Sequence, residues 1–173
     1  MTSAFSPLFL CGSYLDFPKR VYTQEEVDKA RELVQKGYKH ALMIEGSPKF
    51  KHRMQQVTEL VKVADYHDFL RTYLREIIEM EGFSQLRESD AALWANMSML
   101  DDVVNAASYV VQKAQQMKDY LEGNLYYGTG EIASVEKRLE FLRTLKSKSK
   151  SEEVKARCEQ LLKEWAETRI QFP

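Results

Sequence analysis

A band of acidic, amide and hydroxyl side chains runs along the otherwise apolar stretch 93–123, with the alternating spacing of three and four residues that marks one helix face. Such a band can bind a metal ion or a polar ligand if it lines an internal cleft. It needs no ligand if it forms the hydrated face of the helix, and we favour this interpretation because aspartate is rarely buried without a partner. The members of this polar band are Ser98, Asp101, Asp102, Asn105, Ser108, Gln112, Gln116 and Asp119.

Two further acids, Glu76 and Glu79, precede the band in the sequence REIIE. Acids on one helix that face acids on the next can hold Mg²⁺, a hard cation that takes carboxylate oxygens and usually a phosphate substrate. The candidate metal ligands are Glu76, Asp101 and Asp102. In this arrangement the chain resembles the all-α nucleotide pyrophosphatases of the MazG type, which implies Mg²⁺-dependent cleavage of a nucleotide. The second element, DDVVN, differs from the family pattern because Asn105 stands where the family has aspartate.

Other catalytic and metal-binding signatures are missing from the sequence. His40, His52 and His67 have no histidine or glutamate at the helical spacing of a zinc or di-iron site. Cys11 and Cys158 lie at opposite ends of the chain and lack metal-type spacing. The sequence YGTGE lacks the Lys-Ser/Thr pair that completes a phosphate-binding P-loop. We therefore expect no catalytic residues and no cofactor.

Basic residues outnumber acidic residues between positions 137 and 157. Lys146, Lys148 and Lys150 are the candidates for binding the phosphates of RNA or DNA, with an affinity that falls as salt rises. The whole chain has 25 Lys and Arg against 26 Asp and Glu, a formal net charge of −1, so it has no overall attraction to nucleic acid. Phosphate binding by this stretch is therefore an alternative to the main expectation.

Several local signals predict where helices begin and end. The sequence TQEE at 23–26 is a capping box, after which helically spaced apolar residues continue to about residue 45. The sequence GSP at 46–48 combines a helix-ending glycine, a capping serine and a first-turn proline. Further helices are expected over 48–81, as one helix or as two with a kink, over 89–123, over 132–146, and from about 152.

These elements predict an all-α fold, a helical bundle built on two long antiparallel helices at 48–81 and 89–123. No strand-type alternation of useful length follows residue 22. Residues 1–22, rich in Phe, Leu and Tyr, are expected to form an extended arm along the bundle or a partner. The length of 173 residues suits one domain, and residues 23–173 are expected to form a single helical-bundle domain.

The termini and apolar runs predict a cytoplasmic protein with no membrane partner. The apolar run 7–11 is shorter than a signal-peptide core and follows no basic residue, and no stretch approaches the ~20 apolar residues of a membrane span. The surplus of aromatic residues points instead to protein contacts. We expect a non-enzymatic adaptor, chaperone-like or regulatory subunit, self-associating as a homodimer or binding a partner through Trp94, Tyr109, Tyr126 and Tyr127.

Overall fold

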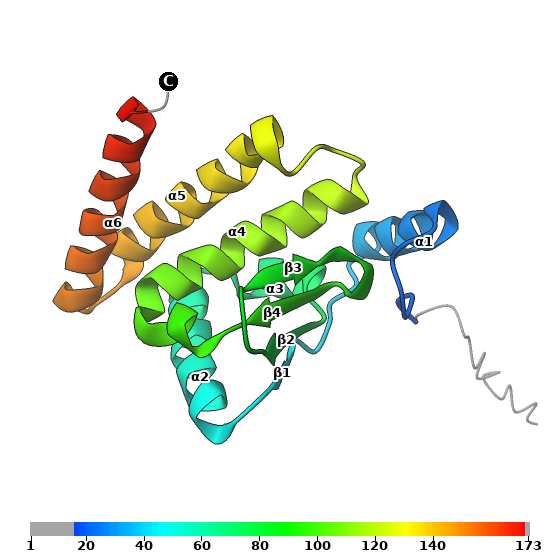
Figure 1. Ribbon diagram of the computed structural model, residues 1–173, viewed down its shortest axis with the longest axis horizontal. Helices are drawn as coiled ribbons and strands as arrows, with labels where there is room; N and C mark the ends of the chain where they lie inside the picture. The colour runs from blue at the N-terminus through cyan, green and yellow to red at the C-terminus, as the bar shows by residue number, and fades with distance from the viewer. Residues whose placement is uncertain (1–15, 172–173) are drawn as a thin grey trace, which may run out of the picture.

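A computed structural model describes the backbone of residues 16–171 and the side chains of residues 16–168 (Figure 1). The described part contains six α-helices and a four-stranded sheet. Five apolar residues of the arm are expected to cover the rest of the chain. Phe9, Leu10, Tyr14 and Leu15 lie outside this range, whereas Phe17 is partly buried and packs against the core.

The first helix, α1 (Gln24–Gln35), begins where the capping box predicts. The Thr23 hydroxyl accepts a hydrogen bond from the N–H of Glu26, and the Glu26 carboxylate accepts one from the N–H of Thr23 at 2.8 Å. The helix ends just before Gly37, whose φ of +88° lies outside the helical range. The expected continuation to residue 45 is therefore wrong, and residues Met43–Glu45 form strand β1 instead.

The second predicted helix is divided into two helices and a strand. Ser47 caps α2 (Pro48–Val63) by accepting a hydrogen bond from the N–H of Phe50 at 3.2 Å, which confirms the start at GSP. A left-handed residue, Asp65 with φ +62°, separates α2 from α3 (His67–Tyr73). The helix does not reach residue 81, because residues Glu76–Glu79 form strand β2.

The third predicted helix is only partly helical. Residues Gln85–Arg87 and Ala92–Ala95 form strands β3 and β4, with short 3₁₀ turns at 88–90 and 97–101. Helix α4 (Val103–Leu121) begins at Asp102, whose side chain accepts a hydrogen bond from the N–H of Asn105 at 3.0 Å. The expected start at Ser89 is wrong. The last two predicted helices are confirmed as α5 (Glu131–Lys148) and α6 (Glu152–Gln171).

The sheet has the order β1-β2-β4-β3, in which β1, β2 and β4 are parallel and β3 runs antiparallel to β4. The connection from β1 to β2 passes through α2 and α3, the helical crossover that a parallel pair requires. Strand β3 forms the edge beside α4, and β1 forms the opposite edge (Figure 1).

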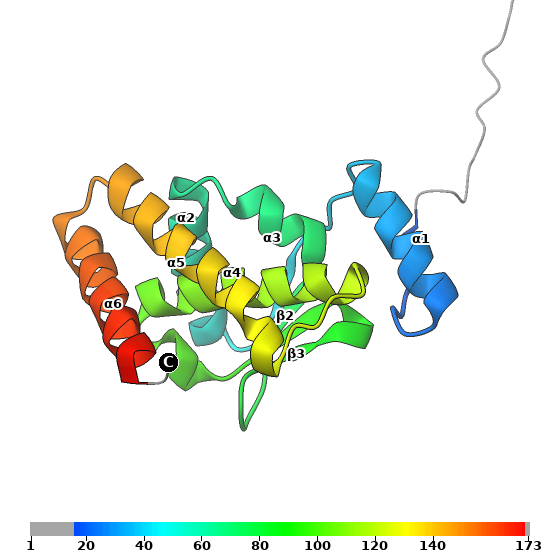
Figure 2. The ribbon, with the colours of Figure 1, turned by 90° about the horizontal axis from the view of Figure 1, so that it is seen from above.

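One face of the sheet is covered by helices and the other is more open. Ile44, Ile77, Leu93 and Leu86 lie side by side in register on the inner face, and the last three are buried. Helices α2, α3 and α4 lie on this side, α5 packs on α4, and α6 packs on α5 (Figures 1 and 2). Because side chains alternate along a strand, Trp94 belongs to the outer face.

The expected all-α bundle on two long antiparallel helices is therefore wrong. The described chain is a mixture of helices with a mixed sheet, and the two long segments are interrupted by β2, β3 and β4. The physical reason is that strands of three or four residues carry too few positions to reveal a period of two. Within residues 16–171, no helix is long and apolar enough to cross a membrane.

Candidate functional site

The central part of the polar band on α4 is buried rather than hydrated. Ser108, Gln112, Gln116 and Asp119 have exposed fractions of 0, 6, 4 and 4%. The interpretation of the band as a solvated face is therefore wrong for these four residues. Gln112 donates to Ser134 of α5, and Gln116 donates to the backbone oxygen of Tyr126 in the loop before α5. Asp119 accepts a hydrogen bond from Gln115 at 2.9 Å, and burial raises the pKa of its carboxyl group.

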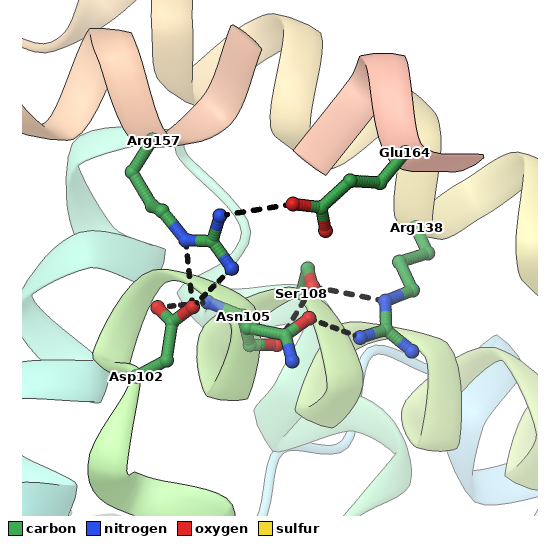
Figure 3. A network of polar contacts seen from close by, with 6 residues as sticks. All are labelled: Asp102, Asn105, Ser108, Arg138, Arg157 and Glu164. Carbon is green, nitrogen blue, oxygen red and sulfur yellow. Dashed lines mark hydrogen bonds and ion pairs between the residues drawn. The ribbon is translucent and has the colours of Figure 1, made fainter. Parts of the chain in front are cut away.

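Arg138 of α5 is the main partner of this buried band (Figure 3). Its Nε donates to Ser108 Oγ at 2.9 Å, its Nη1 to Gln112 Oε1 at 2.8 Å, and its Nη2 to Asn105 Oδ1 at 2.6 Å. Arg138 is only 7% exposed, and burial lowers its pKa to about 10. We call Asn105, Ser108 and Gln112 the arginine socket, because together they hold this cation against α4.

The residue types in the socket, and not their spacing, explain why it holds a guanidinium rather than a metal ion. Ser108 and Gln112 stand four residues apart on one helix face, the spacing at which helical H-E-x-x-H sites present two histidines to zinc. A neutral hydroxyl and a neutral amide oxygen are poor zinc ligands, but they are good acceptors for a forked N–H donor. The socket therefore joins α4 to α5 through three hydrogen bonds.

The candidate metal ligands are not gathered in one place. Glu76 opens β2, whereas Asp101 and Asp102 follow the far end of the neighbouring strand β4. Asp102 caps α4 and pairs with Arg157 of α6 at 2.7 Å (Figure 3). Asp101 is exposed. Among the side chains of residues 16–168, no three His, Cys, Asp or Glu residues come together as a metal site. Glu76 and Glu79 also lie in a strand, where the MazG resemblance implies a helix.

The candidate phosphate-binding lysines lie at the end of α5 and in the loop that follows. Lys146 pairs with Glu159 at 3.4 Å, and Lys148 pairs with Asp65. Lys150 is exposed. Ion pairs thus offset the charges of Lys146 and Lys148, two of the three lysines expected to bind the phosphates of a nucleic acid.

The four candidate partner-binding aromatic residues are brought together around strand β3. Trp94 lies beside Gln85 of β3 in the sheet register. The Tyr109 hydroxyl donates to the backbone oxygen of Ser84, directly before β3, at 3.3 Å. The hydroxyl of Tyr126 donates to Glu88, directly after β3, at 2.8 Å, and its ring lies 5.3 Å from that of Tyr127.

These residues come from three different elements, β4, α4 and the α4–α5 loop, so only the fold places them around the same strand. We call the strand Gln85–Arg87 with these four aromatic residues the β3 edge. Phe83 adds to it, because this residue precedes the strand and is 92% exposed. Tyr127 is 64% exposed. Large aromatic side chains that remain this exposed beside an edge strand are typical of a contact surface.

The charges at the β3 edge are of both signs. The Arg87 guanidinium lies over the Trp94 ring at 4.4 Å. Lys113 Nζ lies 5.0 Å from the centre of the Tyr109 ring, and burial lowers the pKa of this ammonium group. Burial and the hydrogen bond to Glu88 raise the pKa of the Tyr126 hydroxyl, so it stays protonated and donates at neutral pH. The edge therefore offers aromatic surface, fixed hydroxyl groups, two cations and the carboxylate of Glu88.

Two features of the site were missed by reasoning from the sequence. The first is the burial of Arg138, which its place in the basic stretch 137–157 does not suggest, although it lies three residues after Val135 and four before Leu142, on their apolar stripe. That spacing was the available signal for its burial. The strand Gln85–Arg87 gave no comparable signal, because three residues cannot reveal a periodicity.

Comparison of the chain with known protein families, with curated proteins and with solved structures finds no match in any of the three.

Proposed function

We propose that the protein is a non-enzymatic interaction module that binds an extended peptide segment of a partner protein along the β3 edge. The observation that carries the proposal is the meeting of Trp94, Tyr109, Tyr126 and Tyr127 around an edge strand. An adaptor or regulatory subunit needs such a surface, and the aromatic residues that enrich protein interfaces are the ones gathered here.

The backbone of β3 supports this mode of binding. Within residues 16–171, β3 has a neighbouring strand on one side only. The N–H and C=O groups on its other side can therefore pair with an additional strand. A peptide that adds to an exposed sheet edge gains affinity from main-chain hydrogen bonds and specificity from alternate side chains. The hydroxyl of Tyr109 already donates to one backbone oxygen at this edge, that of Ser84.

The side chains around the edge define what the peptide should carry. Successive residues of an added strand point to opposite faces of the sheet. One set would lie toward Trp94 on the outer face, and the other toward Tyr109 on α4, which covers the inner face. We therefore expect an extended segment with apolar or aromatic side chains at alternate positions.

The buried polar band holds α5 against α4 through Arg138, and this structural role favours a binding function over a catalytic one. Ser108 and Gln112, the polar groups of α4 nearest the centre of the band, are engaged by Arg138. A group that holds a neighbouring helix in place cannot also exchange protons freely with a substrate, because breaking its bonds would leave polar atoms buried and unpaired.

The test is selection of peptides from a displayed random library against the full chain, followed by mapping of the binding site by NMR. We expect the selected peptides to alternate apolar and other residues and to shift the backbone amide signals of residues 84–88 and the indole signal of Trp94. Replacing the exposed Phe83 or Tyr127 by Asp should weaken binding about tenfold or more, as loss of an interface anchor does.

A matched control is Met43→Asp on the opposite edge strand β1, where Met43 is 52% exposed. This variant introduces the same charge on an exposed apolar edge position and should bind the selected peptides with unchanged affinity. If Met43→Asp weakens binding as much as Phe83→Asp, or if the NMR shifts fall elsewhere, the β3 edge is not the binding surface.

A further inference from the structure

A pocket of about 290 Å³ opens between α4, α5 and α6, next to the arginine socket. It is lined by two arginines, one carboxylate, two apolar side chains and two neutral polar ones: Arg138, Arg157, Glu164, Leu161, Trp165, Asn105 and Thr168. This volume is at the lower end of the range found for small-molecule sites. The pocket adjoins the β3 edge, because the Arg138 guanidinium also lies 5.7 Å from the centre of the Tyr109 ring, but none of the residues that line it belongs to that edge.

The charges around this pocket are unevenly paired. Asp102 pairs with Arg157 at 2.7 Å, and Glu164 pairs with the same guanidinium at 3.4 Å (Figure 3). Arg138 has no carboxylate partner among the described side chains, and the three atoms that accept its hydrogen bonds are neutral oxygens. Arg157 therefore forms ion pairs with two carboxylates, whereas the more deeply buried Arg138 forms none among the described side chains and has only the longer-range attraction of Asp102.

The Arg138 guanidinium retains hydrogen-bonding capacity. A guanidinium has five N–H donors, and the three socket contacts use one on each nitrogen, which leaves one further N–H on Nη1 and one on Nη2. These two nitrogens form the fork that binds a carboxylate or phosphate with two parallel hydrogen bonds. The ring of Trp165, 5.0 Å from Cζ, offers an apolar surface beside this fork.

We propose that this pocket binds a small organic oxyanion, a carboxylate or phosphate group attached to a planar apolar body. The oxyanion receives hydrogen bonds from the Arg138 fork, and the apolar body lies against Trp165 and Leu161. Binding supplies the negative charge that Arg138 lacks, and burial makes that pairing stronger than it would be at an exposed arginine.

The experiment titrates the ¹⁵N-labelled full chain with benzoate and with phenyl phosphate at constant ionic strength, and follows the Arg138 Nε–H and Trp165 indole signals by NMR. We expect saturable shifts of both signals with a Kd on the order of 1 mM, as for other ligands of about ten heavy atoms. The tighter of the two ligands identifies which oxyanion fits the fork. Benzamide, a neutral analogue of benzoate, should bind at least about tenfold more weakly.

Two variants and a control test whether the ligand occupies this pocket. Arg138→Gln should abolish the shifts, but this variant also removes the socket contacts and can unfold. Thr168→Trp keeps Arg138 and fills the pocket from an exposed position, so it should abolish binding in a folded protein. Arg143→Gln, an exposed position on the same helix, is the control and should bind as the wild type does. Equal binding of benzamide and benzoate, or unchanged binding by Thr168→Trp, would overturn the proposal.

Discussion

His40 is buried with one ring nitrogen unpartnered. It is 4% exposed, and its Nε2 has no hydrogen-bond partner within the described part of the chain. The rings of Phe17 and Tyr38 lie 4.4 and 5.0 Å from it, so it is surrounded by aromatic surface. Burial, aided by the nearby charge of Arg75, lowers the pKa of this imidazole to about 4. The folded protein therefore keeps His40 neutral.

This depressed pKa makes stability depend on pH in a defined direction. Unfolded His40 takes up a proton near pH 6.5, whereas the folded residue does so only near pH 4, so the unfolded state gains protons first as pH falls. From pH 7 to pH 4.5 the free energy of unfolding should drop by about 2–3 kcal/mol because of this residue. Urea denaturation at the two pH values measures the drop.

The contribution of His40 is isolated by the variant His40→Phe, which preserves the aromatic packing and does not titrate. Other carboxyl groups titrate over the same interval, so the informative quantity is the difference between the two proteins. We expect the wild type to lose about 2–3 kcal/mol more than the variant between pH 7 and pH 4.5. Equal losses would show that the imidazole is protonated as easily in the folded state as in the unfolded state.

At the scale of elements, the junction between β1 and α2 depends on a close approach at Gly46. A Cβ atom at this position would lie 2.6 Å from Glu79 Cβ and 2.8 Å from Phe50 Cδ1. Glu79 in turn accepts a hydrogen bond from the N–H of Ser47 at 2.6 Å, and Phe50 is fully buried. The glycine thus allows β2 to contact the start of α2.

Gly46→Ala should lower the free energy of unfolding by about 2–4 kcal/mol, since it combines a clash with a buried ring and an unfavourable φ of +155°. Thermal or urea denaturation measures the loss. Gly37→Ala is the control: its φ of +88° is also unfavourable for alanine, but nothing lies within 4 Å of the added atom. A loss at Gly46 no greater than that at Gly37 would mean that the contact with Glu79 and Phe50 relaxes without cost.

The element boundaries show what local sequence does and does not determine. Caps at Thr23 and Ser47 act within one turn, and the structure places both where the sequence predicts. The strands depend on partners far along the chain. Ile77 and Leu93 pair in the sheet register, yet each also follows helical spacing with its local apolar neighbours, so both patterns fit the same residues. Pairing between distant segments determines that these residues form strands and not helices.

At the scale of the whole molecule, the sequence singles out four aromatic residues but does not predict where in the fold they lie. The sequence has more aromatic residues than the buried faces of the predicted helices require. This surplus indicates Trp94, Tyr109, Tyr126 and Tyr127. Their meeting around β3 required knowledge of the sheet order, which no local pattern carries. Pairing of Arg138 with the polar band could have been inferred from the apolar stripe of α5, because a buried cation requires polar acceptors on the facing helix.

The segment before α1 ties distant parts of the fold together. Val21 is fully buried, its N–H donates to the oxygen of Ser89 at 2.8 Å, and its oxygen accepts a hydrogen bond from the Tyr120 hydroxyl at 2.7 Å. The Arg75 guanidinium donates to the oxygen of Lys19 at 2.8 Å. These contacts connect the segment to the turn after β3, to the end of α4 and to the start of β2.

Deleting residues 1–22 should therefore lower the free energy of unfolding by about 3 kcal/mol, from one buried valine and several hydrogen bonds, less the chain entropy recovered. Urea denaturation measures the loss, and Val21→Ala should reproduce part of it. The matched control removes only residues 1–15 and keeps every contact described above. If that shorter deletion causes the whole loss, the stabilisation comes from the first fifteen residues and not from Val21 and its partners.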